Sequence, residues 1–265
     1  MNAAVESLKA IALQTGIIYG PLRSRRLGIS LGINLLPEDY KVCSFNCVYC
    51  QYGLTPQPSS EISHALKDLP EPEAVSATLE RALHTIARRR QKIDAITFSG
   101  NGEPTLHPDF PAIVETALAL RDRYLPSAKL AALSNSSTVN RPEIGAALNR
   151  LDLKMMKLDA GNEETFHQLN GPASPLYLKD IVAGLRNLND AILQSLFVQG
   201  RVTNADPDSV AAWVETVRQI RPSVVHIYTL DRVPADSRIS KVNRPTLEWI
   251  ASQLRWHAGV KAEIY

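Results

Sequence analysis

The chain has 265 residues, a formal net charge of +2 and an apolar fraction of 45%. These values are typical of a globular protein with a sizeable core, and a charge so close to zero neither demands nor excludes a nucleic-acid partner. The sequence contains no run of about eighteen apolar residues, so a membrane span is not expected. The N-terminus does not resemble a signal peptide, and we therefore expect a cytoplasmic protein without a membrane partner.

Apolar segments alternate with longer amphipathic segments along the chain. The first strand is predicted over Leu27–Pro37, and further strands over 94–100, 129–137, 151–161, 191–202, 223–232 and 260–265. Helices are predicted from apolar residues at three-to-four spacing over 74–90, 108–124, 141–151, 175–189, 206–222 and 244–259. This alternation indicates an α/β fold with a parallel sheet that forms a barrel or partial barrel. We expect a single domain over 1–265, with a core at about 19–232 and a C-terminal helix and strand within 233–265.

Several predicted strands end in polar residues. The polar strand ends are Ser99–Pro104, Ser134–Ser137, Lys157–Asp159, Gln199–Gly200 and Tyr228–Asp231. In a parallel α/β fold the carboxyl ends of the strands meet at one rim, where functional residues concentrate. One polar strand end is explained well enough as a helix cap, but five such ends near a cysteine cluster predict a site on that rim.

The three cysteines, Cys43, Cys47 and Cys50, all lie within eight positions. An odd number would leave one cysteine outside a closed set of disulfides, and the clustering favours a metal over three separate buried thiols. Structural zinc normally takes four protein ligands, of which His64 or His107 could supply the fourth. Three cysteines on a cluster of four irons leave one iron open to a substrate or cofactor. The spacing alone leaves both metals possible.

The motif CxxxCxxC, with Tyr49 before the last cysteine, resembles the signature of the radical S-adenosylmethionine (radical SAM) enzymes. The resemblance implies a partial (βα)6 parallel barrel of the radical SAM type. It also implies a 4Fe-4S cluster held by the three cysteines, with S-adenosylmethionine bound to the open iron. In that family the reduced cluster cleaves S-adenosylmethionine to a 5′-deoxyadenosyl radical, which abstracts hydrogen from substrate. An external electron donor such as flavodoxin or ferredoxin is then expected.

The same resemblance implies roles for other residues on the rim. Asn101, Gly102, Glu103 and Pro104 match a Gly-Gly-Glu-Pro-like turn that binds the methionine amino group; Asn101 replaces the first glycine, and asparagine tolerates left-handed backbone angles. Tyr49 is expected beside the adenine. Asn135 and Ser136 resemble the residues that bind the ribose or carboxylate of S-adenosylmethionine.

The last strand ends supply the candidates for catalytic roles and for the adenine side. Lys157 and Asp159 are expected to reach ribose, carboxylate or substrate, and Lys157 could either form a Schiff base or pair with Asp159. Gln199 and Tyr228 are expected to face the adenine or the substrate. The candidates for catalytic roles are thus Lys157, Asp159 and Tyr228, and Gln199 is a candidate for binding the cofactor.

The segment "YGPLRSRRLGISLGINLLPEDYKVCSFNCVYCQYG", with "TFSGNGEPTLHPDF" and "KLDAG", is similar to the radical SAM branch of the wyosine tRNA-modifying synthase. That synthase has extra cysteines for a second cluster, which this chain lacks, so wyosine synthesis itself is not expected. The substrate is a small molecule or RNA. Arg23–Arg26 and Arg88–Arg90 could contact phosphates, although basic residues at a helix end also suit the helix dipole. The alternatives from other classes are a zinc-stabilised binding protein and a non-catalytic iron–sulfur electron carrier.

Overall fold

The computed structural model describes residues 11–62 and 68–265. Within these residues, the main sheet has eight strands in the order β1-β2-β3-β4-β5-β6-β8-β10. Strand β1 is antiparallel to β2, and every later neighbour in this sheet is parallel. The strands are β1 (Ile18–Ser24), β2 (Gly28–Ile33), β3 (Ala95–Phe98), β4 (Lys129–Ser134), β5 (Leu153–Lys157), β6 (Ile192–Leu196), β8 (Val224–Tyr228) and β10 (Ala262–Ile264).

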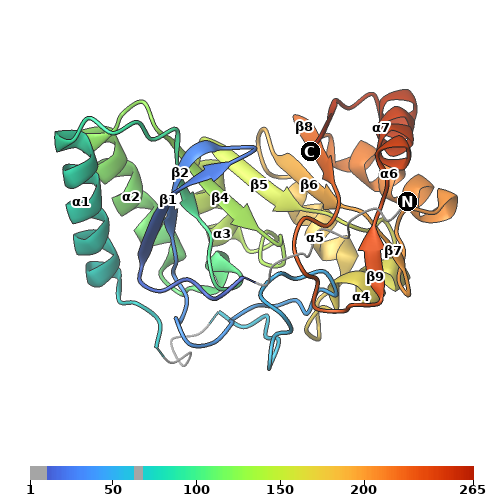
Figure 1. Cartoon of the computed structure of the whole chain (residues 1–265), viewed down its shortest axis with the longest axis horizontal. Coiled ribbons are helices and arrows are strands. Elements are labelled where there is room, and N and C mark those ends of the chain that lie inside the picture. The colour runs from blue at the N-terminus through green and yellow to red at the C-terminus, as the bar shows by residue number, and fades with distance from the viewer. Residues whose placement is uncertain (1–10, 63–67) are drawn as a thin grey trace, which may run out of the picture.

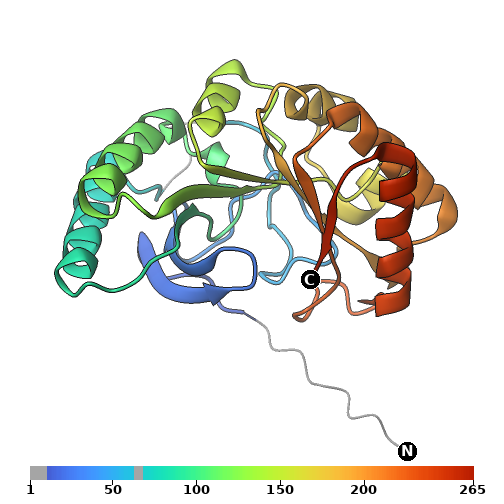
Figure 2. The same cartoon turned by 90° about the horizontal axis from the view of Figure 1, so that it is seen from above.

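The helices cover the convex face of this curved sheet, and the hairpin β1–β2 lies on the concave side (Figure 1, Figure 2). The helices are α1 (Pro72–Arg88), α2 (Phe110–Tyr124), α3 (Pro142–Asn149), α4 (Glu163–Asn170), α5 (Leu178–Leu185), α6 (Pro207–Ile220) and α7 (Arg244–Ala258), with a short 3-10 helix over Pro104–Leu106. Among the described strands, β1 and β10 stay unpaired with each other, so the barrel is open. The expected partial parallel barrel is confirmed.

The apolar pattern explains why helices and sheet pack together. Helix α1 buries Val75, Leu79, Leu83 and Ile86, which recur every three or four residues along one face. All four residues of β3 are buried, as expected for a parallel strand covered on both faces. The core therefore lies between the helices and the convex face, and the concave face is left for the site.

The structure differs from the elements predicted from the sequence in three places, of which two are missed elements and one is a wrong prediction. The segment before the cysteines is a hairpin of two strands, of which the sequence predicted only the second. Helix α4 was not predicted. The single strand predicted over 191–202 is two strands, because β6 ends at Leu196 and β7 (Val198–Gly200) pairs with β9 (Ile239–Lys241) in a separate antiparallel sheet.

In the part of the chain that the structure describes, no helix combines the length and the apolar character needed to cross a membrane.

Candidate active site

A cavity of about 740 Å³ occupies the concave side of the sheet. Because successive side chains of a strand point to opposite faces, alternate residues of each strand line it. On the parallel strands or directly after them, the residues that face the cavity include Ser30, Gly32, Thr97, Ser99, Leu133, Met155, Lys157, Gln194, Leu196 and Tyr228, and the antiparallel strand β1 adds Tyr19, Leu22, Arg23 and Ser24. The lining is rich in hydroxyl, amide and amine groups. Polar groups set among apolar ones in a cavity of this size suit a ligand better than they suit a packed core.

The cysteine loop follows β2 and is fastened at two places across the mouth of this cavity. On one side, Val42 N–H donates to the carbonyl of Asn101 at 3.1 Å, and Glu103 N–H donates to the carbonyl of Val42 at 3.0 Å. On the other side, Asn46 N–H donates to the carbonyl of Asn170 at 2.9 Å, and Ala173 N–H donates to that of Ser44 at 2.9 Å. The loop is therefore held by backbone bonds to the turn after β3 and to the end of α4.

Gly102 lies so close to the backbone of Val42 that no side chain fits at this position. Its φ is +145°, and a Cβ atom would lie 1.7 Å from the Val42 carbonyl oxygen. Gly102→Ala is expected to displace the cysteine loop and to lower the free energy of unfolding by about 1–3 kcal/mol through backbone strain alone. Urea unfolding and the iron content after reconstitution measure the two effects.

Gly145→Ala is the matched control. Gly145 lies inside helix α3, where a Cβ would come no closer than 3.4 Å to Val139, so alanine is expected to keep or raise stability. A Gly102→Ala protein with unchanged stability and iron content would contradict the close packing of Gly102 against Val42.

Each of the three sulfur atoms receives one side-chain N–H. Asn135 Nδ2 lies 3.5 Å from the Cys43 sulfur, and Asn170 Nδ2 lies 3.5 Å from the Cys47 sulfur. Lys41 Nζ lies 3.1 Å from the Cys50 sulfur and 2.9 Å from the carbonyl of Gly53. Donors of this kind stabilise negatively charged thiolates and tune metal centres held by them.

Burial works against ionisation of the free thiols. It raises the pKa of Cys43 to about 12 and that of Cys47 to about 11. At neutral pH these groups become thiolates only when a bound metal displaces their protons. Together with the three N–H donors, this arrangement is suited to a metal centre rather than to a reactive free cysteine.

The donor set fits an iron–sulfur cluster better than a zinc ion. Within residues 11–62 and 68–265, no three His, Cys, Asp or Glu side chains converge closely enough to hold one metal ion. Zinc needs four such ligands around one centre, whereas the cysteines of a cluster ligate separate irons. His107 uses both ring nitrogens in bonds to the Pro70 carbonyl at 3.0 Å and to Asp109 N–H at 3.1 Å. His64 lies outside the described residues.

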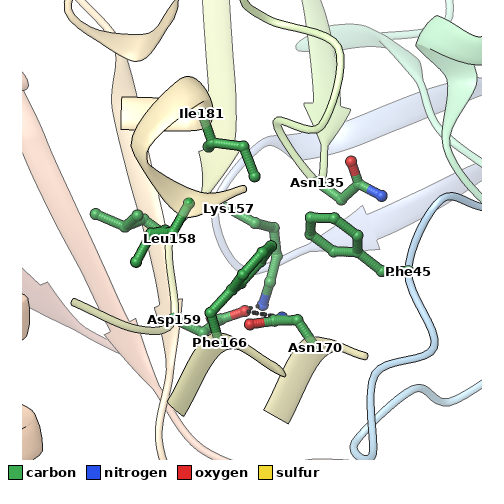
Figure 3. Close-up of a pocket in the computed structure, with 9 residues that line it drawn as sticks. Phe45, Asn135, Lys157, Leu158, Asp159, Phe166, Asn170 and Ile181 are labelled. Atoms are coloured by element: carbon green, nitrogen blue, oxygen red, sulfur yellow. Dashed lines mark hydrogen bonds and ion pairs between the residues drawn. The ribbon is translucent and has the colours of Figure 1, made fainter. Parts of the chain in front are cut away.

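A network of buried polar groups lies beside the cysteine loop, at the end of β5 (Figure 3). Lys157 Nζ is 3.0 Å from Asp159 Oδ1 and donates to the Tyr228 hydroxyl at 3.0 Å. Asp159 Oδ2 accepts bonds from the Tyr49 hydroxyl and, at 3.0 Å, from Asn170 Nδ2. The same lysine lies 4.5 Å from the centre of the Tyr49 ring. The network thus joins β5 and β8 to the cysteine loop.

Lys157 forms the ion pair that was one of its two expected roles. Burial alone would lower its pKa, but the Asp159 carboxylate and the Tyr228 hydroxyl raise the pKa above the usual value for lysine. The amine therefore stays protonated at neutral pH. A protonated amine is no nucleophile, so we do not assign a Schiff base to it.

The structure brings most of the predicted site residues to the cavity. Those that line it are Cys43, Cys47, Tyr49, Cys50, Gly102, Glu103, Asn135, Lys157 and Tyr228. Glu103 is almost fully buried and accepts bonds from Thr105 and, at 2.5 Å, from Asn135 N–H. Burial raises its pKa, which the hydrogen bonds oppose.

Four predicted residues lie outside the lining. Asn101 turns its side chain to Gln14 and to the Pro37 carbonyl, and it does not adopt the left-handed backbone that its place in the turn suggested. Ser136 donates to the Lys157 carbonyl at 2.9 Å. Gln199 lies on β7 and donates to the Lys241 carbonyl at 3.0 Å. Asp159 lies behind Lys157. Their roles in binding the cofactor or substrate stay predictions.

Sequence reasoning missed three residues of the site. Lys41 and Asn170 donate to cysteine sulfurs, and Gln194 lines the cavity with an amide nitrogen that has no hydrogen-bond partner among the described residues. For Asn170 a signal was present. Asn162 caps α4, with acidic residues in the first turn and Gly171 in the left-handed conformation at the end, which is a typical helix pattern.

Known proteins are similar to this chain in sequence. The family model of the Radical SAM superfamily matches residues 38–214. The UPF0026 protein of Methanocaldococcus jannaschii is 30% identical over 227 residues, which cover 84% of this chain and 66% of that protein. The chain thus spans just under two thirds of the length of this relative.

Solved structures are similar in fold at low sequence identity. A radical SAM methyltransferase from Sphaerobacter thermophilus gives a TM-score of 0.63 at 12% identity, over 89% of this chain and 65% of that chain. A structure of TYW1, the wyosine synthase, with a lysine-pyruvate adduct bound gives a TM-score of 0.58 at 14% identity, over 88% of this chain and 74% of that chain. Since the family model covers more than half of the chain and the cysteine loop lies within it, the protein belongs to the Radical SAM superfamily.

Proposed function

We propose that the protein is a radical SAM enzyme in which Cys43, Cys47 and Cys50 hold a 4Fe-4S cluster with one open iron. The observation that carries the proposal is the cysteine loop itself. Three sulfurs lie at one cavity, and each accepts an N–H bond from a different segment, residues 41, 135 and 170. Such a cluster supplies the electron that cleaves bound S-adenosylmethionine to methionine and a 5′-deoxyadenosyl radical, which then takes a hydrogen atom from substrate.

The chain's own residues orient the ligands and shield them from water. We assign Gly102, Glu103 and Asn135 to the methionyl side of S-adenosylmethionine, because they line the cavity beside the cysteine loop. Tyr49 is fixed through its hydroxyl to Asp159, and its ring borders the cavity where the adenine is expected. Lys157 and Tyr228 face the lumen and are assigned to the substrate. An external carrier such as flavodoxin or ferredoxin supplies the electron.

Anaerobic reconstitution with iron and sulfide tests the proposal. A brown protein is expected, whose paramagnetic resonance spectrum changes when S-adenosylmethionine is added to the reduced cluster. With dithionite, 5′-deoxyadenosine and methionine are expected as products. A colourless protein with bound zinc would favour a zinc-stabilised binding protein. A cluster whose spectrum ignores S-adenosylmethionine would favour an electron carrier.

A further inference from the structure

The turn between β1 and β2 reaches across the cavity to the last strands of the sheet. Arg25 Nη2 lies 3.2 Å from Asp231 Oδ2, just beyond β8. The guanidinium of Arg26 lies 4.2 Å from the centre of the Tyr228 ring and 5.5 Å from that of Tyr265. Both views show the tip of this hairpin near the C-terminus (Figure 1, Figure 2). The turn therefore forms one wall of the cavity opening.

Positive charge is concentrated around this cavity. Among the described residues that line it, six are basic and two are acidic, whereas the whole chain has a net charge of only +2. The basic residues are Arg23, Arg25, Arg26, Lys41, Lys157 and Arg232, and the acidic residues are Glu103 and Asp231. A cleft lined by one sign of charge raises the local concentration of ligands of the opposite sign.

Half of these basic side chains already have partners. Arg25 pairs with Asp231, and Lys157 pairs with Asp159. Lys41 donates to the Cys50 sulfur and to a backbone carbonyl. The described residues offer no ion pair to Arg23, Arg26 or Arg232, and all three line the cavity. The positive charge that remains uncompensated therefore comes from β1, from the turn that follows it and from the segment after β8, and not from the cysteine loop.

Of Arg23, Arg26 and Arg232, Arg26 is the one whose guanidinium contacts aromatic rings. It is half-buried, and its guanidinium lies over the Tyr228 ring, while its side-chain N–H groups find no acceptor among the described residues. Glu263, which contacts Tyr265, is already bonded to Lys261 at 2.6 Å. His226 is neutral at pH 7 and adds no charge, since burial and the charge of Arg26 lower its pKa to about 4. A planar fork of free donors at a cavity is the arrangement that binds phosphate or carboxylate.

We propose that Arg26, with Arg23 and Arg232, binds an oxyanion group, phosphate or carboxylate, of a small-molecule substrate. That this group belongs to a substrate rests on the proposed function. A volume of about 740 Å³ lies within the range of small-molecule sites. RNA binding favours an extended basic surface, whereas the charge here gathers at one opening. From Arg26 the substrate extends past Tyr228 and Lys157 toward the cysteine loop.

The test is a calorimetric titration of the reconstituted full-length protein with pyrophosphate and, separately, with citrate. At least one probe is expected to bind. Arg26→Gln is expected to weaken that binding about tenfold or more, because a hydrogen bond to a charged group contributes at least that factor. Arg26→Lys keeps the positive charge but loses the planar pair of N–H donors. Its affinity for the probe is expected to lie between those of the wild type and of Arg26→Gln. Arg88→Gln, the same change on the exposed end of α1, is expected to leave binding unchanged.

Four results would overturn the inference. They are no binding of either probe, equal binding by Arg26→Gln, competition between the probe and S-adenosylmethionine, and tighter binding of a short labelled oligoribonucleotide that Arg88→Gln weakens as much as Arg26→Gln. If Arg26→Gln does not fold by circular dichroism, the exposed Arg23→Gln and Arg232→Gln variants replace it and are each expected to weaken binding. The titration does not depend on 5′-deoxyadenosine formation. Failure of the titration therefore leaves the cluster assignment standing, and failure of 5′-deoxyadenosine formation leaves the oxyanion site standing.

Discussion

Replacing Cys47 with serine is expected to abolish 5′-deoxyadenosine formation and to reduce the iron bound after reconstitution to a small fraction of the wild-type amount. The reason is the softness of the metal. A thiolate binds iron in a cluster, whereas a serine hydroxyl is a hard ligand and stays protonated at neutral pH. Since the chain has only three cysteines, no other thiol can take the place of Cys47. Iron and sulfide assays, with chromatography of the nucleoside product, measure the loss.

Leu54→Ser is the matched control for this change. Leu54 lies in the same segment, four positions after Cys50, and is 60% exposed. The variant adds the same hydroxyl without touching a sulfur, so full iron content and full product formation are expected. Serine at Cys43 or at Cys50 is expected to act like serine at Cys47. Normal turnover by any one of the three cysteine variants would contradict the assignment of that cysteine as an iron ligand.

The features that the sequence predicted well are those fixed by neighbours in the chain. The spacing of Cys43, Cys47 and Cys50 brings three sulfurs to one cavity because a single short loop carries them. The polar residues at or just after the ends of β3, β4 and β5 meet at one rim because parallel strands end on the same side of a sheet. Gly102, Asn135 and Lys157 reach the cavity for this reason.

Gln199 lies outside the cavity lining because the sequence did not show where β6 stops. The mostly apolar segment 191–202 was predicted as one strand that carries Gln199. In the structure β6 ends at Leu196, where the backbone N–H donates to Asp159 Oδ1 at 2.8 Å. The chain then turns outward into β7. The amide that faces the lumen is therefore that of Gln194, which is in the strand proper.

The remaining site contacts could not be predicted, because they join residues far apart in the chain. Asn170 meets Cys47 across 123 positions, and Arg25 meets Asp231 across 206. Neither pair leaves a local pattern. Arg25 and Arg26 were noted in the sequence as possible phosphate contacts, but only the tertiary structure separates the paired Arg25 from the unpaired Arg26.

Asp159→Asn is expected to lower the free energy of unfolding by about 3–5 kcal/mol, the usual cost of leaving one member of a buried ion pair without its partner. The side chain of Asp159 is fully buried. Its Oδ1 faces Lys157 Nζ and the Leu196 N–H, and its Oδ2 faces the Tyr49 hydroxyl and Asn170 Nδ2. All four neighbours are donors. An asparagine amide must therefore point its own N–H₂ at donors in either orientation, and Lys157 keeps a buried charge without compensation.

Three further variants separate the buried charge from a general effect of the substitution. Asp231→Asn makes the same change in the exposed pair with Arg25, whose side chains are 53% and 56% exposed, and is expected to cost at most about 1 kcal/mol. Lys157→Met removes the other member of the buried pair, and combining it with Asp159→Asn removes both charges. The double variant is expected to be more stable than Asp159→Asn alone, because no unpaired charge then remains in the interior. Urea unfolding of the wild type, Asp159→Asn, Lys157→Met and the double variant measures the coupling energy between the two residues. A double variant less stable than Asp159→Asn would contradict the uncompensated lysine charge as the cause of the loss.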